Sequence, residues 1–259
     1  MIHCPTSEFY GHAEIFRQYA GINKKISING RLQHGWTPKK LGGVIAGDSL
    51  DKQGIKFFTW TEMAYGYNHE STKVPIEQNR VFPVGAPILY LNTPRIPQNR
   101  FGVLAIPSHS IATTKIQIGV WEEWCKYILY YYGAKTDVLI HWRDVENGYD
   151  KLVQDIGLGV KTCGRITEYD FLKRNAAILQ SYNYIVSNCV QTSCFYADYL
   201  GTKVIFDGPP TPKDPPAGYD DVVFEKEYVG NFKINCAEEL GLKFKRSPDE
   251  LKNLMFNYA

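Results

Sequence analysis

The sequence has no run of about 20 apolar residues, the length that a helix needs to cross a bilayer. Its first ten residues contain no apolar stretch of signal-peptide length either. We therefore expect a cytoplasmic protein, and any contact with a membrane would be peripheral, at the inner membrane. The six cysteines include no C-x-x-C pair, and the spacing of Cys189 and Cys194 fits no standard zinc site. We expect reduced thiols and no bound metal.

An excess of charge of one sign is also absent. The chain has 29 basic and 27 acidic residues, a net charge of +2, so we expect no nucleic-acid partner. The hydrophobic and charged fractions, 44% and 22%, are those of an ordinary globular protein. A chain of 259 residues with this composition can form one large domain or two small ones.

Four motifs that would identify a common enzyme class are missing. The sequence has no G-x-x-x-x-G-K-[ST], which excludes a P-loop enzyme, and no G-x-G-x-x-G or G-x-S-x-G. The last two absences count against a Rossmann dehydrogenase and an α/β-hydrolase. No D-x-D motif is present to bridge a metal to a pyrophosphate. No separate cofactor is therefore expected.

A proline-containing polar stretch at 92–100 has the composition of a linker. We place a domain boundary there, with a small N-terminal α/β lobe at 1–95 and a C-terminal Rossmann-like lobe at 96–259. A second proline-rich stretch, 209–218, indicates a long loop.

After the linker, apolar runs of strand length alternate with segments of helical periodicity. The predicted strands cover residues 101–107, 136–142, 160–163, 184–187 and 203–207, and the predicted helices cover 119–132, 149–156, 169–181 and 193–200. This alternation is typical of a doubly wound parallel sheet. The N-terminal part is less regular, with an expected helix and four expected strands, at 12–19, 25–29, 44–46, 56–60 and 88–91.

The segment 187–193 follows a predicted buried strand and opens a predicted helix. Open α/β folds bind ligands at this edge of the sheet, where a helix start offers N–H groups to a phosphate. Ser187, Asn188, Thr192 and Ser193 are candidate ligands there. The alternative is that Thr192 or Ser193 only caps the helix.

Two further strand ends carry candidates for the same edge. Ser108, His109 and Ser110 follow the 101–107 strand, and the imidazole of His109 can donate to a phosphate oxygen. Arg165 follows the 160–163 strand and can pair with a phosphate. A structural histidine and a salt-bridged arginine remain the alternatives.

In the N-terminal part, His34 precedes a glycine directly after a predicted strand. A neutral imidazole in such a turn can act as a general base near pH 7, or can simply bond to the backbone. Glu62 and Asp48 are weaker acid or base candidates, since each is also typical of a cap or a surface charge.

Five segments together resemble bacterial surface-carbohydrate and capsule biosynthesis proteins, in the order of glycosyltransferases of the GT-B type. They are LQHGW (32–36), VGAPILYL (84–91), IPSHS (106–110), FLKRNAAILQSYNYIVSN (171–188) and TSCFYADYLGTKVIF (192–206). The resemblance implies two facing Rossmann-like lobes, a nucleotide-sugar donor held by the C-terminal lobe, and a glycan or glycolipid acceptor. It also implies that His34 is the base and that His109 binds the donor phosphate beside Ser187, Thr192 and Ser193.

On this resemblance we expect a metal-independent, inverting glycosyltransferase in surface polysaccharide biosynthesis. Two alternatives stay open. One is a non-hydrolysing sugar-nucleotide epimerase, which needs several acidic residues in its cleft. The other is a non-catalytic carbohydrate-binding or assembly protein with the same fold, which the aromatic content of 14% would suit.

Overall fold

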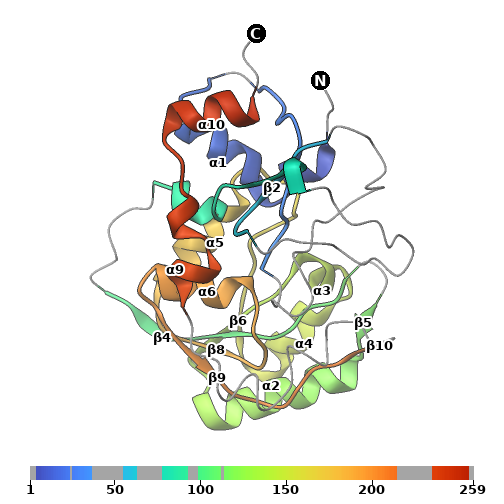
Figure 1. Cartoon of the computed structure of the whole chain (residues 1–259). Helices are drawn as coiled ribbons and strands as arrows, with labels where there is room; N and C mark the ends of the chain where they lie inside the picture. Colours follow the sequence, from blue (N-terminus) through green and yellow to red (C-terminus); the bar gives the residue numbers. More distant parts are fainter. Residues whose placement is uncertain are drawn as a thin grey trace. The chain divides into compact units, whose positions relative to one another are not determined.

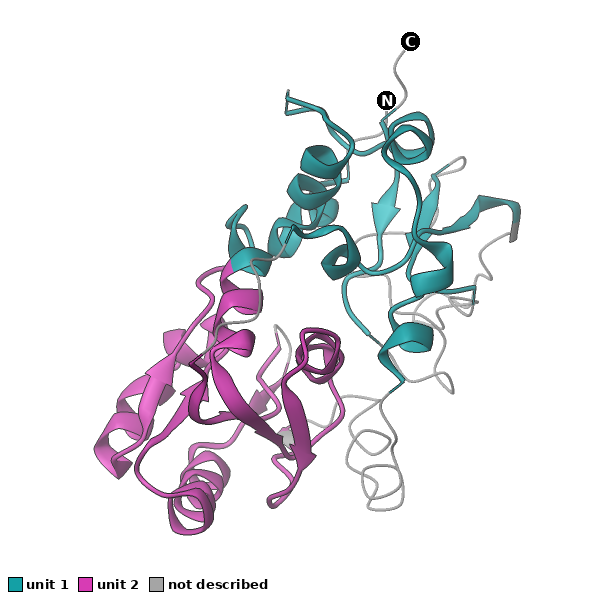
Figure 2. Cartoon of the chain, turned by 90° about the vertical axis from the view of Figure 1, so that its left-hand side faces the viewer, with its two compact units in different colours: residues 1–92, 166–173, 235–259 teal, residues 93–165, 174–234 magenta. Residues whose placement is uncertain are grey.

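The structure is a computed structural model that describes residues 4–23, 25–36, 55–62, 78–92, 99–111, 114–214 and 235–256. The chain divides into two compact units. Unit 1 contains residues 1–92, 166–173 and 235–259, and unit 2 contains residues 93–165 and 174–234 (Figure 2).

Unit 2 is built on a five-stranded sheet with the order β7-β6-β4-β8-β9, in which every strand pair is parallel. The strands are β4 (Phe101–Ile106), β6 (Thr136–Leu139), β7 (Gly159–Lys161), β8 (Tyr182–Ser187) and β9 (Lys203–Phe206). The first strand in the chain, β4, lies in the middle, and later strands extend the sheet first on one side and then on the other. The structure thus confirms the predicted doubly wound parallel sheet.

Helices cover both faces of this sheet, and Figure 1 shows α2 and α6 on opposite sides of it. The helices of unit 2 are α2 (Ile118–Tyr132), α3 (Trp142–Glu146), α4 (Tyr149–Ile156) and α6 (Thr192–Tyr199), together with most of α5 (Phe171–Gln180). A short antiparallel pair, β5 (Lys115–Ile116) with β10 (Lys213–Asp214), lies outside the main sheet. Part of the predicted 209–218 loop is therefore a strand, and residues 215–218 lie outside the described residues.

The core of unit 2 follows from the alternation of side chains along the strands. Ala105 pairs in register with Val138 on one side and with Val186 on the other, so the three share one face of the sheet. Trp121 and Trp124 of α2 pack against that face and are fully buried. Burying an aromatic side chain of this kind contributes about 2–3 kcal/mol.

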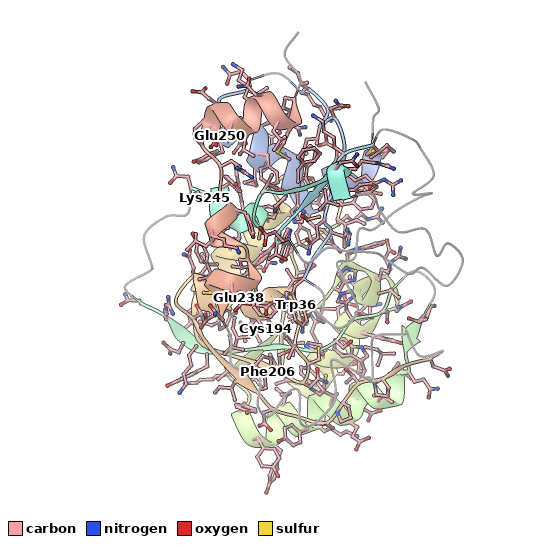
Figure 3. The ribbon with its side chains drawn as sticks, in the orientation of Figure 1. Trp36, Cys194, Phe206, Glu238, Lys245 and Glu250 are labelled. Atoms are coloured by element: carbon pink, nitrogen blue, oxygen red, sulfur yellow. The ribbon has the colours of Figure 1, made fainter. Side chains whose placement is uncertain are left out.

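Unit 1 contains a smaller parallel sheet with the order β1-β2-β3, from Arg31–Leu32, Phe57–Thr59 and Val81–Pro83. Its helical elements are η1 (Pro5–Gly11), α1 (His12–Tyr19), η3 (Gln78–Arg80), η4 (Pro87–Tyr90), α9 (Cys236–Glu239), η5 (Leu242–Phe244) and α10 (Pro248–Met255). Helix α10 begins with a capping box between Ser247 and Glu250, and the bonds from Ser247 lower the pKa of Glu250 (Figure 3).

The predicted division at residue 95 differs from the two units in one respect. The chain first passes from unit 1 to unit 2 near the predicted boundary, after Asn92. Segments 166–173 and 235–259, however, belong to unit 1 and not to the second domain. Each is bound there by its backbone: Tyr10 donates to the carbonyl of Ile166, and Ala86 donates to that of Leu240. A returning segment leaves no signal in local composition, so the linker alone could not reveal it.

Several local predictions in the N-terminal part are corrected by the structure. Residues 88–91, predicted as a strand, lie mostly in the 3₁₀ helix η4, because Pro87 starts a helical turn and a buried apolar run suits either conformation. The strand expected at 25–29 is absent from the described residues of that range, and β1 follows it instead. The strand expected at 44–46 lies outside the described residues.

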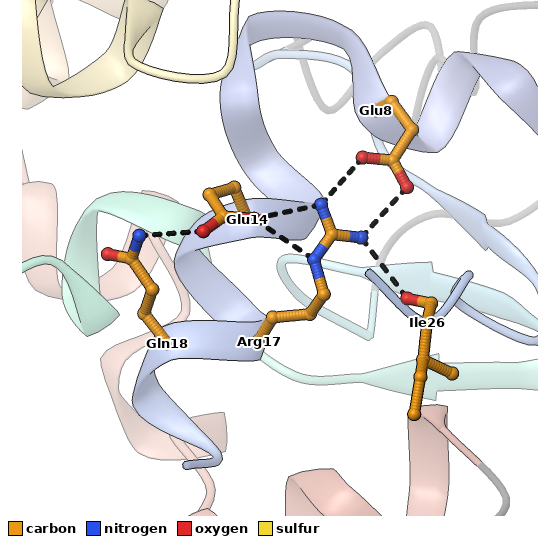
Figure 4. Close-up of polar contacts among 5 residues, drawn as sticks. All are labelled: Glu8, Glu14, Arg17, Gln18 and Ile26. Carbon is orange, nitrogen blue, oxygen red and sulfur yellow. Dashed lines mark hydrogen bonds and ion pairs between the residues drawn. The ribbon is translucent and has the colours of Figure 1, made fainter. Parts of the chain in front are cut away.

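A buried arginine holds the start of unit 1 together. The side chain of Arg17 on α1 is 3% exposed and makes a two-pronged contact with Glu8, at 2.9 and 2.8 Å. It also donates to Glu14 at 3.1 Å and to the carbonyl of Ile26 at 3.2 Å (Figure 4). Burial opposes the charge of Arg17, but these carboxylates outweigh it and raise its pKa.

We expect Arg17→Met to lower the free energy of unfolding by about 2 kcal/mol, because two partly buried carboxylates lose their cation. The matched control is Lys126→Met, which breaks the exposed Lys126–Glu122 pair and should cost less than about 1 kcal/mol. Urea denaturation followed by circular dichroism measures both. Equal losses for the two variants would contradict a structural role for Arg17.

Candidate functional site

The candidate site lies at the carboxyl edge of the sheet in unit 2, between β4 and β8. After β4 the chain continues to β6 on one side, whereas β8 and β9 extend the sheet on the other. The strand order therefore reverses between β4 and β8, the place where open α/β sheets bind their ligands. The segments that follow these two strands carry most of the predicted site residues.

Asn188 joins the loops that follow three neighbouring strands. Its Oδ1 accepts from the backbone N–H of Ser108, at 3.2 Å, in the loop after β4. Its Nδ2 donates to the carbonyl of Pro209 at 2.8 Å and to Oγ1 of Thr211 at 3.0 Å, both in the loop after β9. The side chain of Asn188 is 5% exposed. It therefore acts as a scaffold contact and not as an exposed ligand.

Ser187 and Gln191 connect the end of β4 with the segment that follows β8. The hydroxyl of Ser187 is fully buried and lies 2.8 Å from the carbonyl oxygens of Ile106 and Cys189. Gln191, which sequence reasoning did not single out, donates through Nε2 to the carbonyls of Ile106 and Pro107 at 3.1 and 3.2 Å. The hydroxyl of Ser187, a predicted ligand, is thus engaged in contacts between these two segments.

The loop after β4 is fixed on both sides of His109. Ser108 is held by Asn188, and the N–H of Ser110 donates to the carboxylate of Asp144, at 3.2–3.3 Å. The hydroxyl of Ser110 accepts from the N–H of Ile116 at 3.1 Å. Asp144 is fully buried on α3 and was missed by sequence reasoning, which had placed the end of a strand at 142. Ser108 and Ser110 are buried, and their bonds hold the loop on both sides of His109.

The ring of His109 stacks on a second histidine. The centroids of His109 and His141 lie 4.1 Å apart with an angle of 24° between the rings. His141 follows β6, the strand next to β4, and immediately precedes α3. Sequence reasoning missed it because residues 140–142 read as the end of a strand.

Thr192 and Ser193 form the first turn of α6 and are half-buried. Gln191 precedes them without capping the helix through its side chain, since its amide is bonded to the β4 loop. A helix start with hydroxyls in its first turn suits an anion. Gln191 occupies the cap position, and Thr192 and Ser193 follow it in the first turn.

Arg165 lies elsewhere on this edge. It follows β7, two strands away from β4, and its exposed guanidinium pairs with Glu146 of α3 at 2.9 Å. The structure therefore favours the salt-bridged alternative for Arg165 over a phosphate ligand.

In unit 1, His34 follows β1 at the carboxyl edge of the small sheet. Its Nε2 lies 3.0 Å from the hydroxyl of Tyr10, and the two rings meet edge to face at 4.5 Å. Gln33 fixes the turn before it, since it donates to the carbonyl of Gly35 and accepts from the N–H of Trp60. The indole of Trp36, labelled in Figure 3, donates to Glu239 at 2.7 Å.

Tyr10 is held in a strained conformation. Its φ of 58° is in the left-handed region, and among the described residues no other non-glycine residue has a positive φ. Its N–H donates to the carbonyl of Ile166 at 2.6 Å, and its ring contacts Phe171. A Cβ on the adjacent Gly11 would lie 2.2 Å from the carbonyl oxygen of Tyr169, so only glycine fits there.

The other acid and base candidates of unit 1 do not join this cluster in the described structure. Glu62 is exposed and lies 3.7 Å from Lys243. Asp48 lies outside the described residues.

Three findings bear on other kinds of site. Within the described ranges, no group of three or more His, Cys, Asp or Glu side chains is arranged to hold a metal ion. No helix in that part of the chain is long and apolar enough to span a membrane. All six cysteines are described and none forms a disulfide; burial raises the pKa of Cys194 on α6 to about 11 (Figure 3).

Comparisons with known proteins give only weak similarity. No protein-family model matches the sequence, and no curated protein matches it at a significant level. Among solved structures, the chain is similar to a mutant of TarM from S. aureus in complex with fondaparinux, alpha-GlcNAc-glycerol and UDP. The identity is 13% and the TM-score 0.31, over 79% of this chain and 50% of that one. This chain thus spans half the length of that structure, and a TM-score of 0.31 does not establish a shared fold.

His12 of α1 is buried against the ring of Tyr10 and should lower the stability of unit 1 in acid. Burial, with a smaller contribution from His34, lowers the pKa of His12 to about 3. Below pH 6.5 the unfolded chain therefore binds a proton that the folded chain does not, and stability falls as the pH falls. This costs about 2 kcal/mol at pH 5, from 1.36 kcal/mol per pKa unit.

His12→Phe keeps a ring in contact with Tyr10 but cannot titrate. We expect the difference in unfolding free energy between the wild type and this variant to shift by about 2 kcal/mol between pH 7.5 and pH 5, in favour of the variant. Urea denaturation at the two pH values measures it. A difference that does not change with pH would show that His12 is protonated in the folded chain.

Proposed function

We propose that this chain is a glycosyltransferase that moves a sugar from a nucleotide-sugar donor to a glycan or glycolipid acceptor. The observation that carries the proposal is the fixed loop after β4, which holds His109 at the switch point of the sheet beside the start of α6. This arrangement suits the phosphate of a nucleotide, because it combines an imidazole, hydroxyls and helix N–H groups on one edge.

In the proposed reaction the donor phosphate binds at His109, Thr192 and Ser193. Negative charge grows on that phosphate as the bond to the sugar breaks, and positioned hydrogen-bond donors stabilise it. Asn188 and Asp144 already hold the loop after β4 in place. The hydrogen-bond donors therefore need not move as the charge on the phosphate grows. The transfer would not require a metal ion.

His34 is the proposed general base, which removes the proton from the acceptor hydroxyl as that oxygen attacks the sugar. Tyr10 contacts its Nε2 and orients the ring. Attack from the side opposite the leaving phosphate inverts the anomeric centre. The motifs LQHGW and IPSHS, on which the resemblance to GT-B glycosyltransferases depends, contain His34 and His109. On that resemblance we place the activity in cytoplasmic surface-polysaccharide synthesis.

A thermal-stability panel with CMP, CDP, UDP, GDP, ADP and dTDP tests the donor site. A nucleotide that binds only the folded chain stabilises it by about 2.7 kcal/mol at a hundredfold excess over its Kd. For a chain of this size, that corresponds to a rise in Tm of about 5–10 °C. We expect one nucleobase to be favoured. No rise with any nucleotide would contradict the proposal and favour a carbohydrate-binding or assembly protein.

Ser193→Asp separates binding from stability in this panel. An acidic side chain in the first turn of α6 stabilises the helix but repels a phosphate, so the rise in Tm should disappear. The matched control is Gly119→Asp, which adds the same charge to the exposed first turn of α2, where a Cβ meets no atom within 4 Å. The control should respond to nucleotide as the wild type does.

His34→Ala tests the base. With the sugar donor of the nucleotide identified by the panel, we expect transfer to fall about 10²–10⁴-fold while nucleotide binding is unchanged. Glu62→Gln provides the comparison, since Glu62 is an exposed carboxylate of the same unit. Full activity in His34→Ala would remove His34 from the mechanism, and a comparable loss in Glu62→Gln would show that the loss is not specific to His34.

A further inference from the structure

Two tyrosines near the end of α2 are exposed next to each other. Tyr130 is 81% exposed and Tyr131 is 62% exposed. Trp124 and Ile128, on the other side of the same helix, are fully buried in the core of unit 2. The ring centroids of Tyr130 and Tyr131 lie 4.8 Å apart at an angle of 82°, so the two rings stand edge to face. Adjacent large side chains left in solvent in this way often mark a binding surface.

A third tyrosine fixes this pair on the helix. Tyr127 lies one helical turn before Tyr131, and their ring centroids are 4.4 Å apart at 39°. The hydroxyl of Tyr127 donates to Asp207 at 2.9 Å, and the same carboxylate accepts from Tyr132. The ring of Tyr131 is therefore packed on one side against a ring that is itself held in place, so less side-chain freedom is lost when a ligand binds. We call Tyr127, Tyr130 and Tyr131 the α2 tyrosine patch.

The patch is separate from the proposed donor site, although one loop adjoins both. Asp207, which binds Tyr127, is the residue after β9. Pro209, two residues further along, accepts from Asn188 in the candidate site. None of the three tyrosines is among the proposed ligands of the donor phosphate. A ligand of the patch is therefore a second molecule, or a second part of a long substrate, held by the same unit.

The charge along this helix is balanced. Residues 118–135, which contain α2 and the turn after it, include two acidic and two basic residues. Two of these four, Glu122 and Lys126, pair with each other on the surface. An anionic membrane or a nucleic acid is bound through an excess of lysine and arginine, so neither matches this helix. The chemistry of the patch fits an uncharged ligand.

The size of the patch argues against a second protein chain. An aromatic side chain has about 150–250 Å² of surface, so Tyr130 and Tyr131 together expose roughly 300 Å². A stable dimer buries about 800 Å² on each partner. The other exposed large apolar side chain of α2, Ile118, lies about 18 Å away along the helix and does not enlarge the patch. An area of this size matches a ligand of one or two rings.

We propose that the α2 tyrosine patch binds the sugar rings of an uncharged glycan chain. The inference rests on the proposed function, since it concerns the acceptor of the transfer. One face of a pyranose ring presents C–H groups that stack on a tyrosine ring, while its hydroxyls bond to phenol groups. A glycan that occupies the patch and the transfer site together is retained through its effective concentration, without tight binding at either place.

Saturation-transfer NMR on the full chain tests this binding, with maltoheptaose and chitohexaose as uncharged probes. Irradiation of the tyrosine ring protons should saturate the sugar C–H protons of at least one probe. Tyr130→Ala combined with Tyr131→Ala removes both rings, and alanine keeps the helix intact. The affinity of this variant should fall about tenfold, because two stacking contacts are lost, while its Tm stays that of the wild type.

Two further variants separate stacking from other effects. Tyr130→Phe combined with Tyr131→Phe keeps both ring faces and should retain most of the binding. The matched control is Tyr169→Ala, which removes a tyrosine that is 69% exposed and belongs to unit 1. This control should bind both probes as the wild type does.

No binding of either probe to the wild type, or equal binding by the double alanine variant, would overturn the glycan site. Tyrosine-dependent sedimentation with phosphatidylcholine–phosphatidylglycerol vesicles, in place of oligosaccharide binding, would overturn it in favour of a membrane. A rise in Tm with a nucleotide would leave the proposed function standing in each of these cases. Oligosaccharide binding without a response to any nucleotide would support the patch and overturn the transferase.

Discussion

The side chain of Asn188 is the contact on which the candidate site depends. It has one acceptor and two donor positions, and these connect the loops after β4, β8 and β9. The three strands are neighbours in the sheet, so the loops inherit the rigidity of the paired strands below them. An apolar side chain here would leave buried backbone and hydroxyl groups unsatisfied, at about 1–3 kcal/mol each. The loop that carries His109 is therefore held by the buried amide of Asn188.

The fold of unit 2 could be predicted because its sequence signals are local. The central strands are apolar runs, and α2 and α4 each end at a glycine, Gly133 and Gly157. Unit 1 could not be predicted as well, since its strands have only two or three residues. Its cohesion comes from distant segments, as where Lys245 lies over the rings of Tyr19 and Tyr90 (Figure 3). No periodicity in the sequence records such contacts.

The sequence placed the candidate residues at one edge of the sheet, and the structure brings most of them together there, but their individual contacts were only partly predictable. A polar side chain after a buried strand can face a ligand or satisfy a neighbouring loop, and the sequence looks the same in both cases. Ser187 and Asn188 satisfy loops, as do Ser108 and Ser110. Gln191 and Asp144 escaped notice because their partners are 34 to 85 residues away, and His141 because it read as the end of a strand.

The two candidate histidines are positioned by different physical means. His34 contacts a tyrosine whose backbone is strained, and that strain is maintained by the close approach of Gly11 to Tyr169. His109 is unstrained and depends on hydrogen bonds to its neighbours. Those bonds are made by backbone N–H groups, an amide and a carboxylate, none of which carries a positive charge. The segments 107–111 and 188–193 contain no lysine or arginine, so an anion held there would depend on neutral hydrogen-bond donors of the loop and of the helix start.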